Sequence, residues 1–233
     1  MPGTRLSIVM PVLDEAPIVE SALRQLAGLR AAGVEVIVVD GGSRDATAAV
    51  ALPLADRVVA TARGRARQMN AGAAVARGDV FLFLHADTVL PNDAVAAIEA
   101  ALGGDGTGHR PRALWGRFDV RITGGGPMLA IVAMMMNARS RLTGIATGDQ
   151  AIFVERGAFA AAGGFPDQPL MEDIELSNRL RLIGRPACLR ERVATSGRRW
   201  QSRGVWPTIL LMWRLRLLYR LGVAPERLAR SYR

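Results

Sequence analysis

The sequence predicts a single α/β domain with a mixed, mostly parallel central sheet and a C-terminal helical appendage. Short, near-continuous apolar runs alternate with Ala-rich helical stretches along the first half, as in strands buried on both faces of a parallel sheet. No fixed repeat or Pro/Ser-rich linker divides the 233 residues, of which 50% are hydrophobic and 22% charged. This composition allows a sizeable core and excludes wholesale disorder.

The first half of the chain predicts a βαβ series. Four segments have the β-branched, apolar character of strands: 7–12, 34–39, 58–60 and 80–84. Three segments have helical character: 18–32, 46–52 and 93–102. Ser43 and Asp45 are residue types that cap helix starts, and they precede the second helix.

The second half begins with a Gly-rich run at 103–112 that contains His109. This run follows a helix and lacks the G-x-G-x-x-G spacing of a dinucleotide loop, so a solvent loop is expected. Two further strands are expected at 115–122 and 151–154. Two further helices are expected at 128–141 and 171–183, the second closed by Gly184.

The charge balance excludes several kinds of chemistry. The 30 basic residues outnumber the 21 acidic ones, giving a formal charge of +9, and all of the basic residues are Arg. Without Lys, neither a Walker A loop nor Schiff-base catalysis can be built. Two His and one Cys are too few for a structural zinc site or a disulfide framework.

The Arg excess has three explanations that the sequence leaves open. It is an ordinary solvated surface, an attraction to anionic lipid, or an attraction to phosphate-bearing ligands. We expect no nucleic-acid partner, because the Arg residues are dispersed and only 5% of residues are aromatic. The apolar stretch Leu6–Met10 is too short for a signal peptide, so we expect a cytoplasmic protein.

Carboxylates follow three consecutive predicted strands. Asp14 and Glu15 follow the first, Asp40 the second, and Asp87 the third. Asp is common in turns, which explains any one of these alone. Ligands of open α/β sheets bind at the carboxyl ends of strands, so the three together indicate a binding site there.

The ordered set of motifs resembles the inverting glycosyltransferases of family 2, which have the GT-A fold. The resemblance covers about residues 5–200 and is greatest to short, stand-alone bacterial members. It rests on these segments: 11–16, 38–47, 64–72, 76–79, 83–87, 148–150, 163–165 and 171–176. It implies a transferase domain at 1–200, with a nucleotide-binding half at about 1–102 and an acceptor half at about 113–200. A helical tail follows at 201–233.

The resemblance implies a UDP- or GDP-sugar donor and roles for individual residues. Asp40 would bind the base, and Arg65 or Arg67 the diphosphate, since a guanidinium can bind two oxygens at once. The wall around base and ribose, including the turn glycine, would be formed by Pro11, Val12, Leu13, Glu15 and Gly42. Gly41 replaces the second Asp that is usual in this turn.

A divalent metal, Mn²⁺ or Mg²⁺, is also implied. The family's Asp-x-Asp motif is His85-Ala86-Asp87 here, which keeps the second carboxylate and replaces the first. Hard divalent ions prefer oxygen ligands, so the diphosphate would supply much of the coordination. His85 is either a metal ligand or a supporting residue.

The acidic start of the helix at 171–183 is the expected catalytic centre. The resemblance implies that Asp173 is the general base that deprotonates the acceptor hydroxyl. Glu172 and Asp149 are the other candidates. The plainer alternative is that Glu172 and Asp173 complement the helix dipole.

The acceptor side is less well defined. The Met-rich segment 128–136 is either core packing or an adaptable wall for an apolar acceptor. Segment 205–222 is apolar with three Trp or Tyr residues, but its three Arg oppose a membrane span, at about 2.5–3.5 kcal/mol each. It is expected either to lie on a membrane surface or to pack on protein. The acceptor, which would then be lipid-linked, and any homo-oligomer are not specified by the sequence.

Two other functions compete with sugar transfer. A non-catalytic protein that binds nucleotide or a membrane surface would keep the fold without the chemistry. A sugar-nucleotide pyrophosphorylase would normally carry a Gly-rich loop with Arg and Lys after the first strand, where Pro11–Glu15 stands here.

Overall fold

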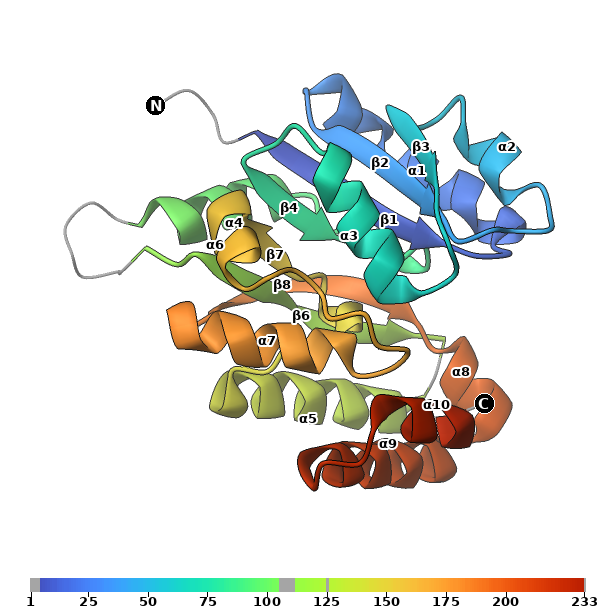
Figure 1. The fold of residues 1–233 in the computed structure, drawn as a ribbon, viewed down its shortest axis with the longest axis vertical. Coiled ribbons are helices and arrows are strands. Elements are labelled where there is room, and N and C mark those ends of the chain that lie inside the picture. Colours follow the sequence, from blue (N-terminus) through green and yellow to red (C-terminus); the bar gives the residue numbers. More distant parts are fainter. Residues whose placement is uncertain (1–4, 105–111, 125, 233) are drawn as a thin grey trace.

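The computed structural model describes residues 5–104, 112–124 and 126–232. In this part of the chain, an eight-stranded sheet runs through the molecule in the order β3-β2-β1-β4-β7-β6-β8-β5 (Figure 1). The strands are β1 Leu6–Val12, β2 Glu35–Asp40, β3 Arg57–Ala60, β4 Val80–Phe83, β5 Thr88–Val89, β6 Trp115–Thr123, β7 Phe153–Glu155 and β8 Ala187–Ser196.

The sheet is parallel in its first half and mixed in its second. β1 pairs in parallel with both β2 and β4, and β2 pairs in parallel with β3. β7 is antiparallel to both β4 and β6, which reverses the sheet's direction at its centre. β6 and β8 are again parallel, and β5 is an antiparallel edge strand on β8. The carboxyl ends of β1, β2 and β4 therefore share one edge.

Helices cover both faces of the sheet. The described helices are α1 Ala16–Ala31, α2 Thr47–Ala51, α3 Arg65–Val75, α4 Ala94–Gly103, α5 Pro127–Thr143, the 3₁₀ turn η1 Gly148–Gln150, α6 Arg156–Ala161, α7 Glu172–Ile183, α8 Arg198–Arg203, α9 Val205–Arg220 and α10 Pro225–Tyr232. Alternate residues of β1 point to opposite faces: Ile8 packs with residues of α1, α4 and α5, whereas Val9 packs with α3, α6 and α7.

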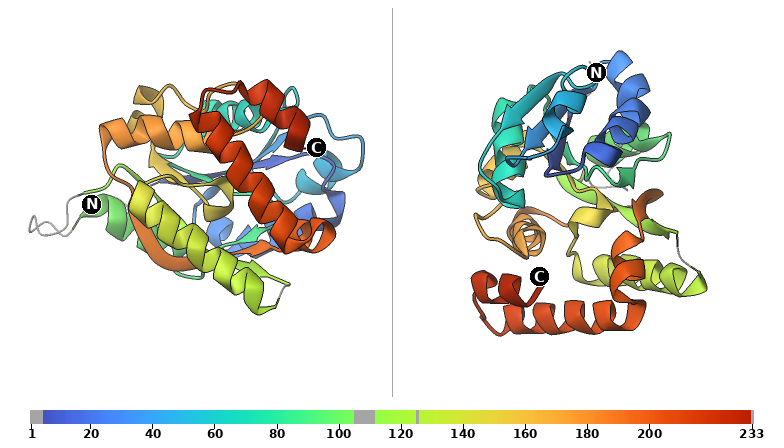
Figure 2. Two further views of the ribbon diagram at one scale, coloured as in Figure 1. Left: turned by 90° about the horizontal axis from the view of Figure 1, so that it is seen from below. Right: turned by 90° about the vertical axis from the view of Figure 1, so that its right-hand side faces the viewer.

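The C-terminal helices form a layer at one end of the molecule. Figure 2 shows α9 lying across this end, with α10 folded back beside it. A small apolar cluster of Met171, Leu215 and Leu228 joins α9 and α10 to the start of α7. The hydroxyl of Tyr219 on α9 lies 3.3 Å from Oε2 of Glu175 on α7. The C-terminal segment is therefore anchored on the domain by one face of α9.

The predicted fold class is confirmed. The predicted strands and helices of the βαβ series are present, with ends that differ by one or two residues. The division into two halves and a tail at residue 201 stays a prediction. Residues 105–111, including His109 and most of the expected loop at 103–112, lie outside the described residues.

Several elements depart from the sequence analysis: the helices α3 and α6 and the strands β5 and β8 were not among the expected elements. No strand was expected between Gly184 and Ser196, yet β8 occupies Ala187–Ser196. Its central charged residues Arg190, Glu191 and Arg192 hide the apolar pattern, because most of this strand is only partly buried. The expected cap by Ser43 is wrong: its hydroxyl bonds the carboxylate of Asp40, whereas Asp45 accepts the N–H of Thr47 at 2.9 Å.

Candidate active site

The loops after β1 and β2 are bonded to each other by side chain–backbone hydrogen bonds. The N–H of Asp14 donates to Oγ of Ser43 at 2.9 Å, and the N–H of Arg44 donates back to the carboxylate of Asp14 at 2.7 Å. The N–H of Glu15 donates to Oγ1 of Thr47 at 2.8 Å. These contacts hold the two loops, residues 13–15 and 41–46, in one fixed arrangement. They are here called the strand-end loops.

Asp40 holds the turn of the second strand-end loop. Its side chain is buried, and its Oδ2 accepts the N–H groups of Gly42 at 3.1 Å and Ser43 at 3.0 Å. A Cβ at Gly41 would lie 2.9 Å from Cδ of Gln68. The Gln68 amide itself bridges the strand ends, donating to the carbonyls of Val12 and Val39 at 2.8 and 2.9 Å. A side chain at position 41 would therefore crowd the Gln68 amide.

The other residues expected around base and ribose differ in their access to solvent. Pro11 and Val12 are buried in β1, and Val12 belongs to the core. Leu13 is partly exposed where the strand ends, and Gly42 is exposed with a φ of +88°. Of these four, Leu13 and Gly42 are therefore the residues that a ligand can reach.

Glu15 and Asp87 place two negative charges at the same edge. Burial, and secondly the charge of Asp87, raises the pKa of Glu15 to about 7. Nη2 of Arg198, at the start of α8, lies 4.0 Å from Oδ2 of Asp87. Arg198 was not among the predicted site residues. Only the fold of β8 and α8 shows that it reaches Asp87.

A small pocket lies beside this edge, between α3, η1 and α7. It is lined by Arg65, Met69, Phe83, His85, Gly148, Ile152, Phe165, Glu172 and Asp173. Glu172 is 4% exposed, and its Oε1 lies 3.6 Å from Nη1 of Arg65. Burial and the charge of Asp173 raise the pKa of Glu172. Two carboxylates and one guanidinium thus face a common space.

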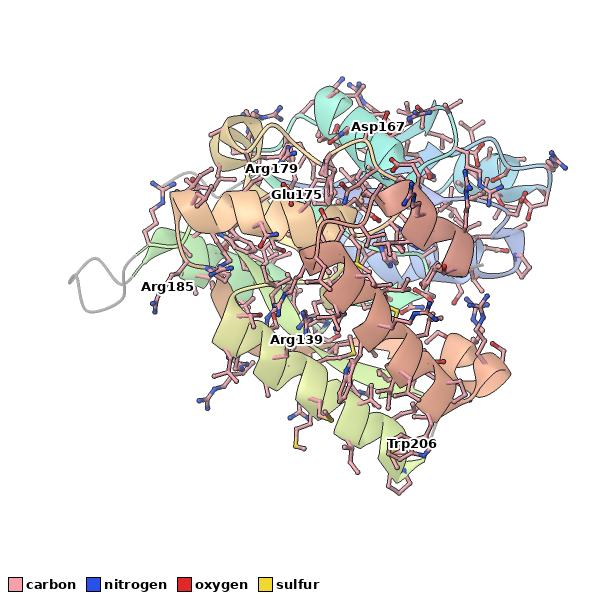
Figure 3. All side chains as sticks on the ribbon, turned by 60° about the horizontal axis from the view of Figure 1, so that its bottom comes forward. Arg139, Asp167, Glu175, Arg179, Arg185 and Trp206 are labelled. Atoms are coloured by element: carbon pink, nitrogen blue, oxygen red, sulfur yellow. The ribbon has the colours of Figure 1, made fainter. Side chains whose placement is uncertain are left out.

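The two arginines expected near the diphosphate are separated by the fold. Arg65 lines the pocket, on the first turn of α3. Arg67 instead pairs with Asp167, its Nε lying 2.8 Å from Oδ1, and both side chains are exposed. Figure 3 labels Asp167 on the loop before α7. Of the two, Arg65 is the one that the structure brings to the other candidates.

Asp173 is fixed in orientation by backbone donors. Its Oδ2 accepts the N–H of Gly148 at 2.9 Å, and its Oδ1 accepts the N–H of Ile174 at 2.7 Å. Asp149 follows Gly148 on η1, and its Oδ1 lies 3.8 Å from Nδ1 of His85. A Cβ at Gly148 would lie 2.6 Å from Cε1 of His85, so His85 packs directly on this turn. The fold therefore brings His85, Asp149 and Asp173 together.

Backbone strain occurs beside the candidate residues. Among the described residues, three non-glycine residues have positive φ: Asp14 at 53°, Ala151 at 47° and Met171 at 66°. Asp14 immediately precedes Glu15, Ala151 follows η1, and Met171 immediately precedes Glu172. Such conformations cost of order 1–3 kcal/mol each and are frequent at functional sites. Their positions support the view that these segments form one site.

The acidic residues fit a divalent cation only if the ligand contributes oxygens. No group of three or more His, Cys, Asp or Glu side chains able to hold a metal is found in the described part of the chain. The pKa of Glu15 is raised first by burial and secondly by the charge of Asp87, and a cation at this edge would relieve the repulsion between these two carboxylates. Asp87 with diphosphate oxygens would give the oxygen-rich set that Mn²⁺ or Mg²⁺ prefers.

Several solved structures are similar to this chain. A mannosyltransferase from Pyrobaculum calidifontis in complex with GDP-Man and Mn²⁺ matches with a TM-score of 0.62 and 21% identity over 82% of this chain. S. aureus TarS 1–349 matches with a TM-score of 0.63 and 15% identity over 83%. Glucosyl-3-phosphoglycerate synthase from Mycobacterium tuberculosis, in complex with Mn²⁺ and UDP-Glc, matches with a TM-score of 0.56 and 21% identity over 83% of this chain.

These similarities establish the fold. The chain spans 56%, 60% and 70% of the lengths of the three proteins, respectively. A comparison with curated protein sequences gives no match. The sheet with helices on both faces is the GT-A fold. The family model for glycosyl transferase family 2 matches residues 7–125, about half of the chain, and includes β1, the strand-end loops and Asp87. The chain therefore belongs to glycosyl transferase family 2.

Proposed function

We propose that this protein transfers a sugar from a nucleoside-diphosphate sugar to an acceptor hydroxyl with inversion, using Asp173 as general base. The observation that carries the proposal is the fixed carboxylate of Asp173, which lines the same pocket as Arg65 and His85. The structures with bound GDP-Man or UDP-Glc and Mn²⁺ support a GDP- or UDP-sugar as donor. Leu13, Gly42 and the Asp40 turn would receive the nucleoside.

The reaction needs one proton acceptor and one place for departing negative charge. Asp173 takes the proton of the acceptor hydroxyl while that oxygen forms a bond to the anomeric carbon. The bond from this carbon to the diphosphate breaks on the opposite face, so configuration inverts and no covalent enzyme intermediate forms. The guanidinium of Arg65 lies where it would stabilise the leaving diphosphate.

Asp87, together with donor oxygens, would hold the divalent cation. When bound, the cation supplies further stabilisation of negative charge on the diphosphate. His85 would support this edge by packing on Gly148 and keeping Asp149 in place. Glu172, buried against Arg65, would position that guanidinium, which leaves Asp173 as the carboxylate with access to an acceptor.

A screen of UDP- and GDP-sugars tests the proposal. Donor turnover, measured as release of nucleoside diphosphate, should require Mn²⁺ or Mg²⁺ and should fail in Asp173→Asn. A protein that binds nucleoside diphosphate but never releases it from any sugar donor would be the non-catalytic alternative. Release of nucleoside triphosphate on addition of pyrophosphate would instead identify a pyrophosphorylase.

We further propose that α9 contacts a membrane surface. Among the described residues, no helix is long and apolar enough to cross a membrane. One face of α9 and the following turn carry an exposed apolar stripe, here called the α9 stripe: Trp206, Leu210, Trp213, Leu217 and Leu221. By the 3.6-residue turn, the exposed Arg214 and Arg220 lie at its two borders. Helix α5, which carries the exposed Met134 and Met135, lies at the same end of the molecule as α9 (Figure 1).

A surface of this kind fits the interface of an anionic bilayer. Trp side chains suit the headgroup region, and arginines suit lipid phosphates. The opposite face of α9 packs on the domain through Leu215. The α9 stripe is therefore free to bind lipid without unfolding the tail. This arrangement would bring a lipid-linked acceptor close to the pocket.

A further inference from the structure

Two arginines on the acceptor side are partly buried and have shielded guanidinium nitrogens without hydrogen-bond partners among the described residues. Arg139 lies on α5, and Arg216 lies on the inward border of α9. Nε and Nη2 of Arg139 and Nε of Arg216 are shielded from solvent, and none of these three atoms has a hydrogen-bond partner among the described residues. Figure 3 shows Arg139 in the space between α5, α7 and α9.

The two guanidinium groups are close enough to affect each other. Burial, and secondly the positive charge of Arg216, lowers the pKa of Arg139 to about 10. Burial also lowers the pKa of Arg216, while the nearby charge of Asp173 opposes the shift. Both side chains are still cations at neutral pH. Partial burial of two such charges side by side, with no carboxylate in direct contact, is unfavourable, and it favours an anionic partner.

The neighbouring protein groups do not supply that partner. Asp173 lies near both arginines, but no hydrogen bond between described residues joins its carboxylate to either guanidinium; it accepts the backbone N–H groups of Gly148 and Ile174 instead. Asp149 faces His85. Arg117, which also lies near Arg139, is itself bonded to Asp119 and Ser140. No carboxylate of the described chain lies within 4.0 Å of the Arg139 or Arg216 guanidinium.

We propose that Arg139 and Arg216 bind a phosphate group carried by the acceptor. A phosphate offers several oxygens to the two planar donor forks, and each guanidinium can bind two of them. The proximity of both arginines to Asp173 places this phosphate on the acceptor side of the base, away from Arg65 and Asp87. The inference rests on the proposed function and adds the acceptor class: a phosphomonoester, either soluble or lipid-linked.

Binding of phosphomonoester probes tests this inference without requiring sugar transfer. The intact protein is titrated with glycerol 3-phosphate, with glycerol as its control, and with farnesyl phosphate in detergent micelles, with farnesol as its control. Mn²⁺ and a nucleoside diphosphate are present in one series, to block the donor edge, and absent in another. Affinity is measured by calorimetry and by the shift in unfolding temperature.

The double variant Arg139→Gln/Arg216→Gln should lose about tenfold or more in affinity for the phosphate probe. Arg77→Gln, which removes an exposed arginine just after α3, is the matched control and should bind as the wild type does. Without ligand, the double variant should unfold at the same or a higher temperature, because two unpaired buried charges are gone. If it does not fold, the single variant Arg216→Gln replaces it.

Binding of either phosphate probe that depends on both arginines supports the inference, and the probe that binds distinguishes a lipid from a soluble source. Wild-type protein that binds neither probe would overturn it, as would variants with unchanged affinity. Loss of nucleoside diphosphate affinity in the variant, with phosphomonoester affinity intact, would assign the arginines to the donor and also overturn it. Failure of donor turnover alone would contradict the proposed function and leave these binding results standing.

Discussion

The strand-end loops and the helical layer of α5, α7 and α9 differ in whether their polar groups form hydrogen bonds within the protein. In the loops, Asp14, Asp40, Ser43 and Thr47 accept or donate hydrogen bonds within the protein. In the helical layer, Arg139 and Arg216 have buried nitrogens without hydrogen-bond partners, and Trp206 leaves 63% of its surface exposed. One region is complete in itself, whereas the other has unused binding capacity.

This difference suggests how the two substrates are handled. A donor edge whose loops are already bonded to each other loses little conformational freedom when the nucleotide binds. An acceptor side with unpaired cations and an exposed apolar stripe gains its missing contacts from the acceptor and its surroundings. The predictions below each test one side of this contrast, from the largest expected effect to the smallest.

Asp173→Asn should lower the rate of sugar transfer by about 100-fold to 10,000-fold, because the amide has nearly the same shape but cannot take the acceptor's proton. Nucleoside diphosphate affinity, measured by calorimetry, should not change. Asp167→Asn is the matched control, since Asp167 is exposed and pairs with Arg67 away from the pocket. A variant that turns over near the wild-type rate would move the role of base to Asp149 or Glu172.

Asp87→Ala should weaken Mn²⁺-dependent binding of nucleoside diphosphate by more than about 100-fold. Loss of an outer-shell partner of a metal commonly costs 10-fold to 100-fold, and loss of a direct ligand costs more. Asp93→Ala, which removes an exposed carboxylate before α4, serves as the control. Equal affinities of Asp87→Ala and wild type, with and without Mn²⁺, would show that Asp87 is not a metal ligand.

The sequence located the residues of the proposed donor edge better than those of the proposed acceptor side, for a physical reason. Asp40, Glu15 and Asp87 follow apolar strands whose order fixes where they meet, so periodicity locates them. Arg65 and Arg67 could not be separated, because only the loop that carries Asp167 decides which of them is paired elsewhere. Arg198 begins α8, which follows β8, a strand hidden by its charged centre. Arg216 lies on α9, and its partial burial depends on the packing of α9 near the start of α7, which the sequence does not show.

Glu15 provides a pH-dependent test of the donor edge. Its pKa is raised by burial to about 7 from about 4.5 in the unfolded chain, so the folded state binds this proton more tightly. The contribution of Glu15 to the free energy of unfolding of the metal-free protein should therefore be most favourable below pH 4.5. It should fall as the pH rises to 7. The loss should reach up to about 2 kcal/mol after allowance for partial exposure.

Glu15→Gln should remove this part of the pH dependence. Urea unfolding of wild type and variant at pH 5 and pH 7.5, both with a chelator, gives the difference. The variant should be more stable than the wild type at pH 7.5, and the gap should narrow at pH 5. Glu20→Gln, an exposed residue of α1, is the control. A gap of the same size at both pH values would show that Glu15 titrates normally.

The smallest expected effect concerns the membrane surface. Arg214→Gln should weaken binding to liposomes that contain anionic lipid by about fivefold, since one arginine near such a surface contributes about 1 kcal/mol. Arg77→Gln removes the same charge from an exposed site just after α3, far from α9, and should leave binding unchanged. Flotation at low and high salt is the measurement, because electrostatic attraction is screened by salt.

Trp206→Ser/Trp213→Ser should weaken binding at both salt concentrations, because it removes apolar contact rather than charge. Wild-type protein that does not float at low salt, or an Arg77→Gln effect as large as that of Arg214→Gln, would show that the α9 stripe is not a membrane surface and that only its buried face has a role.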